Sequence, residues 1–363
     1  MLKVGVIGLG TVSPIHLLSI NNSPYAKLVA VCDINSNRAK EKCEQTHCEI
    51  IPSYTDYKEM IEKEDLDVLH ITLPHYLHAE VSKYALSKGL NVFCEKPVDI
   101  SYEKTKDLYD FYQAYKRKQK LGICFQNRYN KSVVRLKEIL EENEEEVFAV
   151  KGLVTWYRNM DYYKQAPWRG TLKEAGAGVI INQAIHTLDL MAYVTGKDWK
   201  SLTATMSKLM NKEVEVEDTA NAFIKYEDGV NGLFIATNAY SITDSIELQV
   251  ISKNEKYTIK ENRLFNRNLE CLAEDEKSDA TKDYYGAGHE TLINKFYKAI
   301  IDGTDDYCDL ADAMETMEII QAIIDSSNEN KEVKKEEIIN DENRSTGFNS
   351  SRFFQGSRTL RNI

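Results

Sequence analysis

A lysine stands at the end of a short apolar segment that has the composition of a buried strand. Residues 91–94 (NVFC) are followed by Glu95, Lys96 and Pro97. Proline has no backbone donor and cannot continue a central strand, so the strand is expected to end at the lysine. The carboxyl ends of strands in an open parallel sheet face the crevice in which ligands bind, so Lys96 would stand over a ligand. A surface lysine beside a turn proline would explain the same tripeptide, because a short motif needs context.

A second group of polar residues recurs at helical spacing. Asn182, His186 and Asp189 are separated by four and three residues, which places them on one face of a helix expected over residues 179–190. Apolar residues form the adjacent stripe. A histidine on such a face can act as a general acid or base. The alternative is a buried histidine that is hydrogen-bonded to Asp189.

A glycine-rich turn follows the first expected strand. Residues 8–13 (GLGTVS) form a dinucleotide-binding fingerprint in which serine replaces the third glycine. Ser13 is a good N-cap and Pro14 suits the first helical position, so a helix is expected to begin there. The loop amides and the helix dipole would then hold a pyrophosphate. The loop residues expected to contact the cofactor are Gly8, Gly10, Thr11 and Val12.

An acid follows the second expected strand. Asp33 lies roughly 20 residues beyond the glycines, where a carboxylate accepts hydrogen bonds from the adenosine ribose. This position favours NAD, whereas Arg38 is close enough in sequence to meet a 2′-phosphate and leaves NADP open. The alternative is that Asp33 is only a loop or cap residue.

A parallel sheet would bring these residues together. Strand-like runs at residues 3–7, 27–32, 68–73, 91–94 and 121–125 alternate with helical patterns at 14–21, 36–45, 55–62, 77–87 and 101–118. Such alternation predicts an α/β Rossmann-type domain over residues 1–125. The third strand is followed by polar residues that can line the cofactor, namely Thr72, Pro74, His75 and His78; His78 could equally lie on a helix surface.

Taken in order, these motifs resemble the Gfo/Idh/MocA oxidoreductases, the family of glucose-fructose oxidoreductase and inositol dehydrogenase. The resemblance covers roughly residues 1 to 335. It implies a nicotinamide cofactor on the first domain, with Glu95 and Asn127 among its contacts. It also implies a catalytic pair in which Lys96 touches the nicotinamide ribose and the reacting oxygen, and His186 acts as general base or acid. The matching stretches are Gly8-x-Gly10-x-x-Ser13-x-x-His16, Asp33, Thr72-x-Pro74-x-x-x-His78, Glu95-Lys96-Pro97, Trp168-Arg169-Gly170, Gly176-x-Gly178 and His186-x-x-Asp189.

From residue 126 the alternation gives way to strand signals. Strands are expected at residues 147–157, 201–210, 219–226, 230–237, 246–251 and 256–259, and Asp228-Gly229 predicts a hairpin. Helices are expected at residues 132–142, 289–302 and 309–326. We therefore expect an α+β domain over residues 126–337 with a large, mostly antiparallel open sheet, the arrangement that the resemblance implies. An uncovered face would pair subunits into a homodimer or homotetramer.

An aromatic and basic stretch precedes the His186 helix. It consists of Tyr157, Arg158, Tyr162, Tyr163 and Trp168. Aromatic faces pack on sugar rings, and arginine recognises a carboxylate or phosphate through its planar fork, although sheet-edge packing explains at least half of the stretch. The expected substrate contacts are Asn182, Arg128, Tyr163, Trp168 and Arg169.

One residue departs from the family pattern. Many sugar and inositol dehydrogenases of the family carry aspartate where this chain has Asn182. Asparagine does not titrate. Proton transfer would then fall to His186 and Lys96.

Composition limits the class of protein. The 363 residues include 46 basic and 57 acidic ones, and the net charge of -11 disfavours nucleic acid and anionic membranes as partners. Several of the seven cysteines lie in apolar runs, which is typical of a reducing cytoplasm. No repeated Cys/His cluster predicts a metal site. Residues 338–363 form a polar, basic tail that is expected to be disordered, or to dock on a neighbouring subunit.

The sequence thus predicts an NAD(P)-dependent oxidoreductase that transfers hydride between nicotinamide and a carbinol carbon of a sugar, cyclitol or sugar derivative. Two alternatives stay open. One is a cofactor-binding regulator that senses a sugar without turnover. The other is an NAD-assisted glycosidase.

Overall fold

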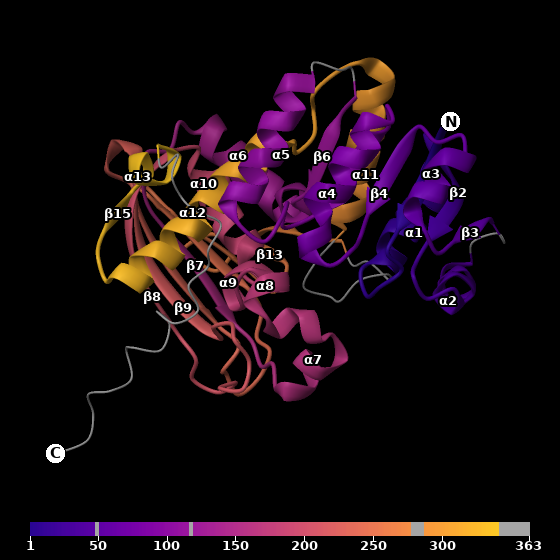
Figure 1. The fold of residues 1–363 in the computed structure, drawn as a ribbon. Coiled ribbons are helices and arrows are strands. Elements are labelled where there is room, and N and C mark those ends of the chain that lie inside the picture. Colours follow the sequence, from indigo (N-terminus) through magenta and orange to yellow (C-terminus); the bar gives the residue numbers. More distant parts are fainter. Residues whose placement is uncertain (48–50, 116–118, 277–286, 341–363) are drawn as a thin grey trace.

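The chain forms two sheets that share one continuous hydrophobic core, as a computed structural model shows (Figure 1). The structure describes residues 1–47, 51–115, 119–276 and 287–340. The part of the tail beyond residue 340 lies outside the described residues.

The first sheet is parallel and six-stranded, in the order β3-β2-β1-β4-β5-β6. Apolar residues fill its strands on both sides because helices cover both faces, which is typical of parallel sheets. The Rossmann-type prediction is confirmed. The strands are β1 (Leu2–Ile7), β2 (Ala26–Cys32), β3 (Ser53–Tyr54), β4 (Val68–Ile71), β5 (Asn91–Glu95) and β6 (Leu121–Cys124). The helices are α1 (Ser13–Asn22), α2 (Asn37–Thr46), α3 (Tyr57–Lys63), η1 (His75–Leu77), α4 (His78–Ser87) and α5 (Tyr102–Tyr115).

The second sheet is nine-stranded and mostly antiparallel, in the order β14-β13-β12-β11-β7-β10-β9-β8-β15, with one parallel pair formed by β7 and β10. Buried and exposed residues alternate along β9 and β10, because helices cover only one face. This prediction is also confirmed. Its strands are β7 (Val147–Thr155), β8 (Trp199–Ser207), β9 (Thr219–Tyr226), β10 (Asn231–Thr237), β11 (Glu247–Ser252), β12 (Lys256–Lys260), β13 (Arg263–Phe265), β14 (Cys271–Glu274) and β15 (Val333–Lys334).

The helical segments after β6 are short around the site and long elsewhere. They are η2 (Gln126–Tyr129), α6 (Lys131–Glu142), α7 (Met160–Gln165), η3 (Pro167–Gly170), α8 (Leu172–Ala175), α9 (Val179–Asn182), α10 (Ile185–Thr195), η4 (Glu227–Gly229), α11 (Gly288–Asp302), α12 (Leu310–Glu329) and α13 (Lys335–Ile339). Asp228 and Gly229 have positive φ, as the expected hairpin between β9 and β10 requires.

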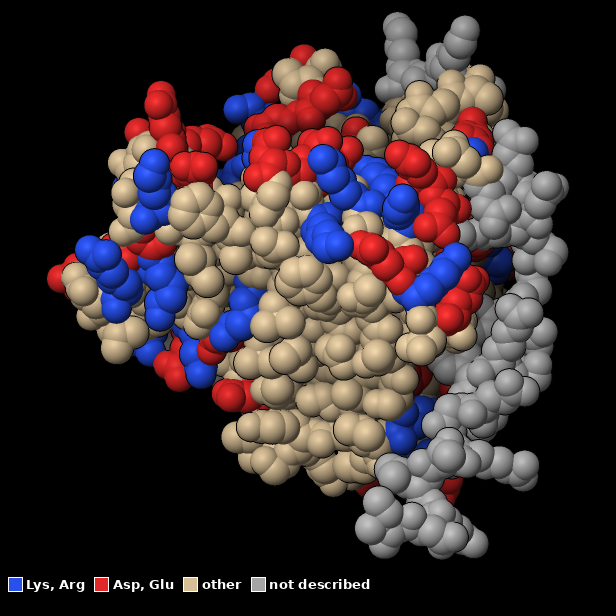
Figure 2. Space-filling model, turned by 90° about the vertical axis from the view of Figure 1, so that its left-hand side faces the viewer, with Lys and Arg blue, Asp and Glu red and all other residues tan. Residues whose placement is uncertain are grey.

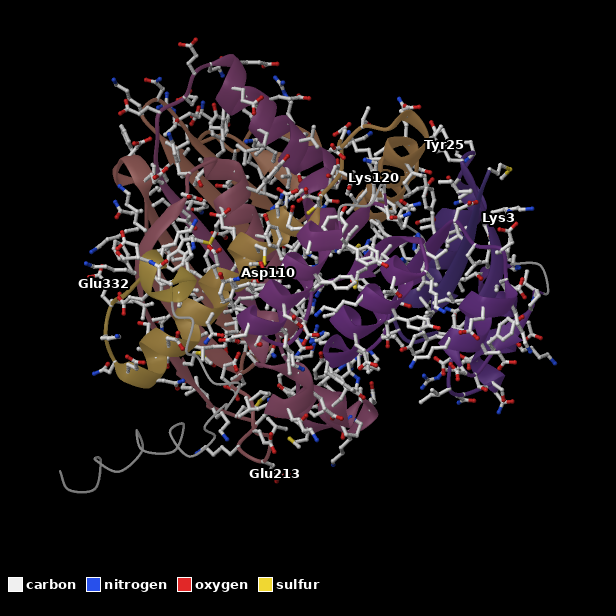
Figure 3. All side chains as sticks on the ribbon, turned by 45° about the horizontal axis from the view of Figure 1, so that its top comes forward. Lys3, Tyr25, Asp110, Lys120, Glu213 and Glu332 are labelled. Atoms are coloured by element: carbon white, nitrogen blue, oxygen red, sulfur yellow. The ribbon has the colours of Figure 1, made fainter. Side chains whose placement is uncertain are left out.

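The C-terminal helices join the two sheets. The amide of Ile123 in β6 donates to Cys308 O at 2.9 Å, and α11 packs against α1. Lys120, labelled in the upper part of Figure 3, pairs with Asp305 in the α11–α12 connection at 2.6 Å. Residues late in the chain therefore reach the first sheet, while the expected domain boundary at residue 125 stays a prediction.

Candidate active site

Lys96 lies where the sequence places it, directly after β5, and it lines a cavity of about 250 Å³. Its Nζ donates to the backbone oxygen of Asn182 at 3.3 Å, a contact between residues 86 positions apart in the chain. Burial lowers the pKa of Lys96, and the charge of Glu95 opposes this shift. The lysine is thus a partly desolvated cation held across the two halves of the chain.

The helix expected over residues 179–190 is in fact two helices. α9 ends at Asn182 and α10 begins at Ile185. In a continuous helix the Asn182 carbonyl would accept the amide of His186, so the break frees that carbonyl for Lys96. The side chain of Gln183 helps to hold the break, because it accepts from Asn238 Nδ2 at 2.9 Å and donates to the Tyr162 hydroxyl at 2.8 Å.

Backbone packing fixes the start of α9. A Cβ on Gly178 would lie 1.8 Å from Glu217 O, and one on Gly176, whose φ is +82°, would lie 2.0 Å from Ile100 O. The buried carboxylate of Glu217 accepts the amides of Gly178 at 2.7 Å and of Ile180 at 3.2 Å. Burial raises the pKa of Glu217 to about 7 despite these bonds. The Gly176-x-Gly178 motif is therefore explained by close backbone approach.

His186 lies at the start of α10 and lines the same cavity as Lys96. Its pKa is well below the usual range, because the ring is buried and Lys96 is nearby. Gln126 Nε2 lies 3.3 Å from His186 Nε2, and an amide nitrogen can only donate, so the ring accepts at Nε2. His186 is thus a neutral imidazole whose basic nitrogen is Nε2.

Behind Lys96 the carboxylate of Glu95 belongs to a buried chain of hydrogen bonds. Glu95 Oε1 lies 2.9 Å from His16 Nε2, His16 Nδ1 lies 2.9 Å from His70 Nδ1, and His70 Nε2 lies 2.7 Å from the Tyr297 hydroxyl. His289 Nε2 lies 3.8 Å from Glu95. Burial alone would raise the pKa of Glu95, but its bonds to His16 and His289 hold it well below the usual range. Glu95 is therefore a charged support for the residue that follows it.

His16, Glu95 and Cys124 also place potential metal ligands within 4.8 Å of one another. The Glu95 oxygen is already bonded to His16, and burial raises the pKa of the Cys124 thiol well above its usual range. A thiol in this state is a poor metal ligand. The expectation of no metal stays a prediction.

A second cavity of about 420 Å³ adjoins the first, because Thr11, Leu73, Trp168 and Arg169 line both. It extends past Gly8 and Gly10 to Asp33 and Arg38. Asp33 Oδ2 accepts the amide of Leu9 at 2.8 Å, and Arg38 Nη1 lies 3.3 Å from the same oxygen. Asp33, which follows β2, thus stabilises the loop that follows β1.

The glycine loop fits a dinucleotide. Gly8 has a φ of +88°, and a Cβ there would lie 2.6 Å from Thr72 O. A Cβ on Gly10 would meet no atom within 4 Å, so open space lies beside its backbone. The helix begins at Ser13 rather than after it, and the Ser13 hydroxyl bonds back to Gly10 O at 3.0 Å. Ser13 therefore stabilises the loop through this hydrogen bond and is not the expected N-cap.

Some residues after β4 line a cavity, and others hold neighbouring loops together through hydrogen bonds. Pro74 lines the larger cavity, while His75 and His78 line the smaller one. Both nitrogens of His78 lie 2.7 Å from backbone oxygens, those of Pro97 and Leu73, so His78 joins the loops after β4 and β5. Thr72 is buried and its hydroxyl bonds to Gly8 O and Ile7 O, away from both cavities.

Several expected contacts lie elsewhere. Arg128 is buried against Asp189, with Nη2 2.7 Å from Oδ1, and also pairs with Asp312. Asp189 therefore does not support His186, and Arg128 does not line either cavity. Tyr163 packs in a small separate core with Leu172 and Val216. Asn127 is buried outside the lining of both cavities.

The structure adds residues that sequence reasoning missed. Gln126, Trp156, Gln183 and His289 line the cavity that contains Lys96. Gln126 lies two residues after the end of β6 and could have been found from this position. His289 reaches the site only through the packing of α11 on the first sheet, for which no local signal exists.

No helix in the described part of the chain is long and apolar enough to cross a membrane.

Comparisons with known proteins agree with this architecture. Residues 2–122 match "Oxidoreductase family, NAD-binding Rossmann fold", and residues 133–256 match "GFO/IDH/MocA C-terminal domain". Inositol 2-dehydrogenase of Salmonella typhimurium (strain LT2) is 27% identical over 232 residues, which are 63% of this chain and 65% of that protein. The chain thus spans slightly less than two thirds of that relative.

Two solved structures share the fold over nearly the whole chain. An oxidoreductase from Agrobacterium radiobacter, in complex with NAD+, L-tartaric acid and magnesium, has a TM-score of 0.82 at 18% identity and covers 93% of this chain and 99% of its own. The WlbA dehydrogenase from Bordetella pertussis, in complex with NADH and UDP-GlcNAcA, has a TM-score of 0.79 at 21% identity and covers 92% and 98%. With both halves matched in order, the chain belongs to the Gfo/Idh/MocA oxidoreductase family and carries its NAD-binding Rossmann fold.

Proposed function

We propose that the chain is an NAD-dependent dehydrogenase that acts on a CH–OH group of a sugar, cyclitol or sugar derivative. The observation that carries this proposal is the meeting of Lys96 and His186 in one cavity that adjoins the cavity lined by Gly8, Gly10 and Asp33. A relative that oxidises inositol and a neighbour that holds UDP-GlcNAcA support the substrate class.

The bound nicotinamide would accept or supply the hydride. Lys96 would donate a hydrogen bond to the substrate oxygen and stabilise its negative charge, because its ammonium is held by Asn182 O in a partly desolvated site. His186, kept neutral by burial, would take the hydroxyl proton during oxidation. Asn182 would orient the substrate without titrating.

The larger cavity would hold the adenosine and pyrophosphate. Gly8 and Gly10 let the backbone approach the phosphates, and Asp33 meets the ribose hydroxyls. We further propose that the enzyme is cytoplasmic, and that the uncovered face of the second sheet pairs with another copy of the chain.

A substrate screen tests the proposal. The full-length protein is incubated with NAD+ and a panel of sugars, inositols, sugar acids and nucleotide sugars, and NADH formation is followed by absorbance. Net NADH with an oxidised product is expected for at least one compound. Binding without NADH formation would instead support the sensing regulator, and glycosidic cleavage without net NADH would support the NAD-assisted glycosidase.

A further inference from the structure

Two arginines differ from all others in the described part of the chain. Every other described arginine pairs with a carboxylate, in the pairs Arg38–Asp33, Arg128–Asp189, Arg135–Glu138, Arg263–Glu261 and Arg267–Glu255. Arg158 and Arg169 form no ion pair among the described residues, and both line the cavity that contains Lys96. Because the protein has a net charge of -11, carboxylates are in excess over basic side chains. Two guanidinium groups without an ion pair in one cavity are therefore unusual and need an explanation.

Aromatic rings hold both guanidinium groups in place. Arg158 lies over the Trp156 ring at 4.7 Å and the Tyr162 ring at 5.6 Å. Arg169 lies over Tyr162 at 4.6 Å and Trp168 at 5.7 Å. Both arginines therefore lie close to the Tyr162 ring. Stacking leaves the guanidinium edges, which carry the N–H donors, available for a planar anion.

The lining of the cavity is cationic overall. Lys96, Arg158 and Arg169 contribute positive charge, and Glu95 is the acidic residue among the lining residues. Glu95 is already hydrogen-bonded to His16, which lies 2.9 Å away. Part of the hydrogen-bonding capacity of Arg158 is used, since Nη1 donates to Tyr157 O at 2.8 Å and Thr243 Oγ1 at 3.0 Å. Its other nitrogens and those of Arg169 make no further hydrogen bond to the described residues that line the cavity.

We propose that the substrate carries an anionic oxygen group, a carboxylate or a phosphate, and that Arg158 and Arg169 bind it as specificity-determining residues. This inference rests on the function proposed above. A neutral sugar would leave Arg158 without a charged partner, whereas an anionic one would receive charge-assisted hydrogen bonds from both arginines.

Arg169 also lines the dinucleotide cavity, so it has a second possible ligand in the cofactor phosphates. Arg158 lines only the smaller cavity. The two residues therefore have to be tested separately, with cofactor affinity measured alongside.

The experiment measures binding by isothermal titration calorimetry to the full-length protein loaded with NADH. The ligands are D-glucose and its anionic derivatives D-glucuronate, D-glucose 6-phosphate and UDP-glucose. The proteins are the wild type, Arg158→Met, Arg158→Lys, Arg169→Met and the control Arg135→Met, which removes a paired arginine from the surface of α6. NADH affinity is measured for each protein.

At least one anionic derivative should bind the wild type roughly ten- to hundredfold more tightly than glucose, and the tightest identifies the anionic group. Arg158→Met and Arg169→Met should remove most of this preference while glucose binding stays within roughly threefold of wild type, and NADH affinity should stay within the same range in Arg158→Met. Arg158→Lys should retain part of the preference for the anionic derivative, and Arg135→Met should retain all of it.

Three results would overturn the inference: glucose binding as tightly as its derivatives, absence of binding by all three derivatives, or a preference that survives both Met variants. A loss of NADH affinity in Arg169→Met, together with an unchanged preference for the anionic derivative in Arg158→Met, would show that Arg169 binds the cofactor and that Arg158 does not bind the substrate. This result would also overturn the inference. Because binding is measured without turnover, this outcome is independent of the NADH-formation screen.

Discussion

At the scale of single residues, Asp33 should decide the choice of cofactor. Asp33 lines the larger cavity, in which we propose that the adenosine binds, and its carboxylate pairs with Arg38, whose charge it partly neutralises. A 2′-phosphate against a carboxylate costs about 1 kcal/mol or more, so NADH should bind roughly fivefold or more tightly than NADPH. Titration of both cofactors measures the ratio, and Asp33→Asn should narrow it. Tighter binding of NADPH by the wild type would mean that Arg38 outweighs Asp33.

The pH dependence of oxidation should follow the low pKa of His186. A base must be neutral to accept the hydroxyl proton, and burial beside Lys96 keeps His186 neutral to a pH below 6.5, the ordinary pKa of histidine. The acid limb of kcat/KM should therefore lie below pH 6.5. The alkaline limb should lie below the ordinary pKa of lysine, 10.5, because burial lowers the pKa of Lys96. A pH–rate profile measures both limbs, and an acid limb above pH 6.5 would exclude His186 as the base.

Most of these residues could be found from the sequence because each one follows a strand that its own composition reveals. Lys96, Asp33 and the glycine loop are examples, since strand ends in a parallel sheet share one edge. Arg128 and Tyr163, which were expected at the substrate, line neither cavity, because Asp189 and Val216 lie against them, and a sequence does not show such contacts. A local sequence pattern predicts on which face of a helix or strand a side chain lies, but not which distant residue it contacts.

At the scale of elements, the break between α9 and α10 is the feature that the sequence did not reveal. The apolar period continues from residue 179 to 190, and no glycine or proline interrupts it. Tertiary contacts produce the break instead, through the bonds of Gln183 with Asn238 and Tyr162. The apolar period correctly predicted helical structure here, but it predicted one helix where the structure has two. The break between them leaves the Asn182 carbonyl free to accept from Lys96.

Glu217 should be needed to hold α9 in place. Glu217→Ala leaves the amides of Gly178 and Ile180 without their carboxylate acceptor in a buried site, at a cost of roughly 1–3 kcal/mol in the free energy of unfolding. Turnover should fall as Asn182 moves relative to Lys96, while NADH affinity is retained. The matched control is Glu213→Ala, an exposed residue of the same connection that is labelled in Figure 3. Thermal unfolding and kinetics test this, and unchanged stability and turnover in Glu217→Ala would contradict it.

At the scale of the whole molecule, the uncovered face of the second sheet should be an interface. Figure 2 shows a broad area without charged side chains on the side of the molecule where this sheet lies. Phe223 and Leu233, which are paired across β9 and β10, are 44% and 46% exposed, and Ile235 and Ile251 are exposed nearby. An apolar surface of this kind on a sheet is typical of subunit contacts.

Light scattering tests this interface. The wild type should be a dimer or tetramer at micromolar concentration, and the double variant Phe223→Lys/Leu233→Lys should be smaller, because two buried charges would face each other across the contact. Leu269→Lys, which changes an equally apolar residue in the connection between β13 and β14, should keep the wild-type mass. A monomeric wild type would remove the basis for the interface.

The central claim is that Lys96 acts on the reacting oxygen. The direct measurement is kcat of Lys96→Ala with a substrate identified in the screen, together with its NADH dissociation constant. The side chain contributes to the smaller cavity, and the glycine loop and Asp33 supply the dinucleotide site, so NADH affinity should stay close to wild type. The kcat should fall by roughly 10²-fold or more, as expected when a group that stabilises an oxyanion is removed. Full activity of Lys96→Ala with unchanged NADH affinity would contradict the account.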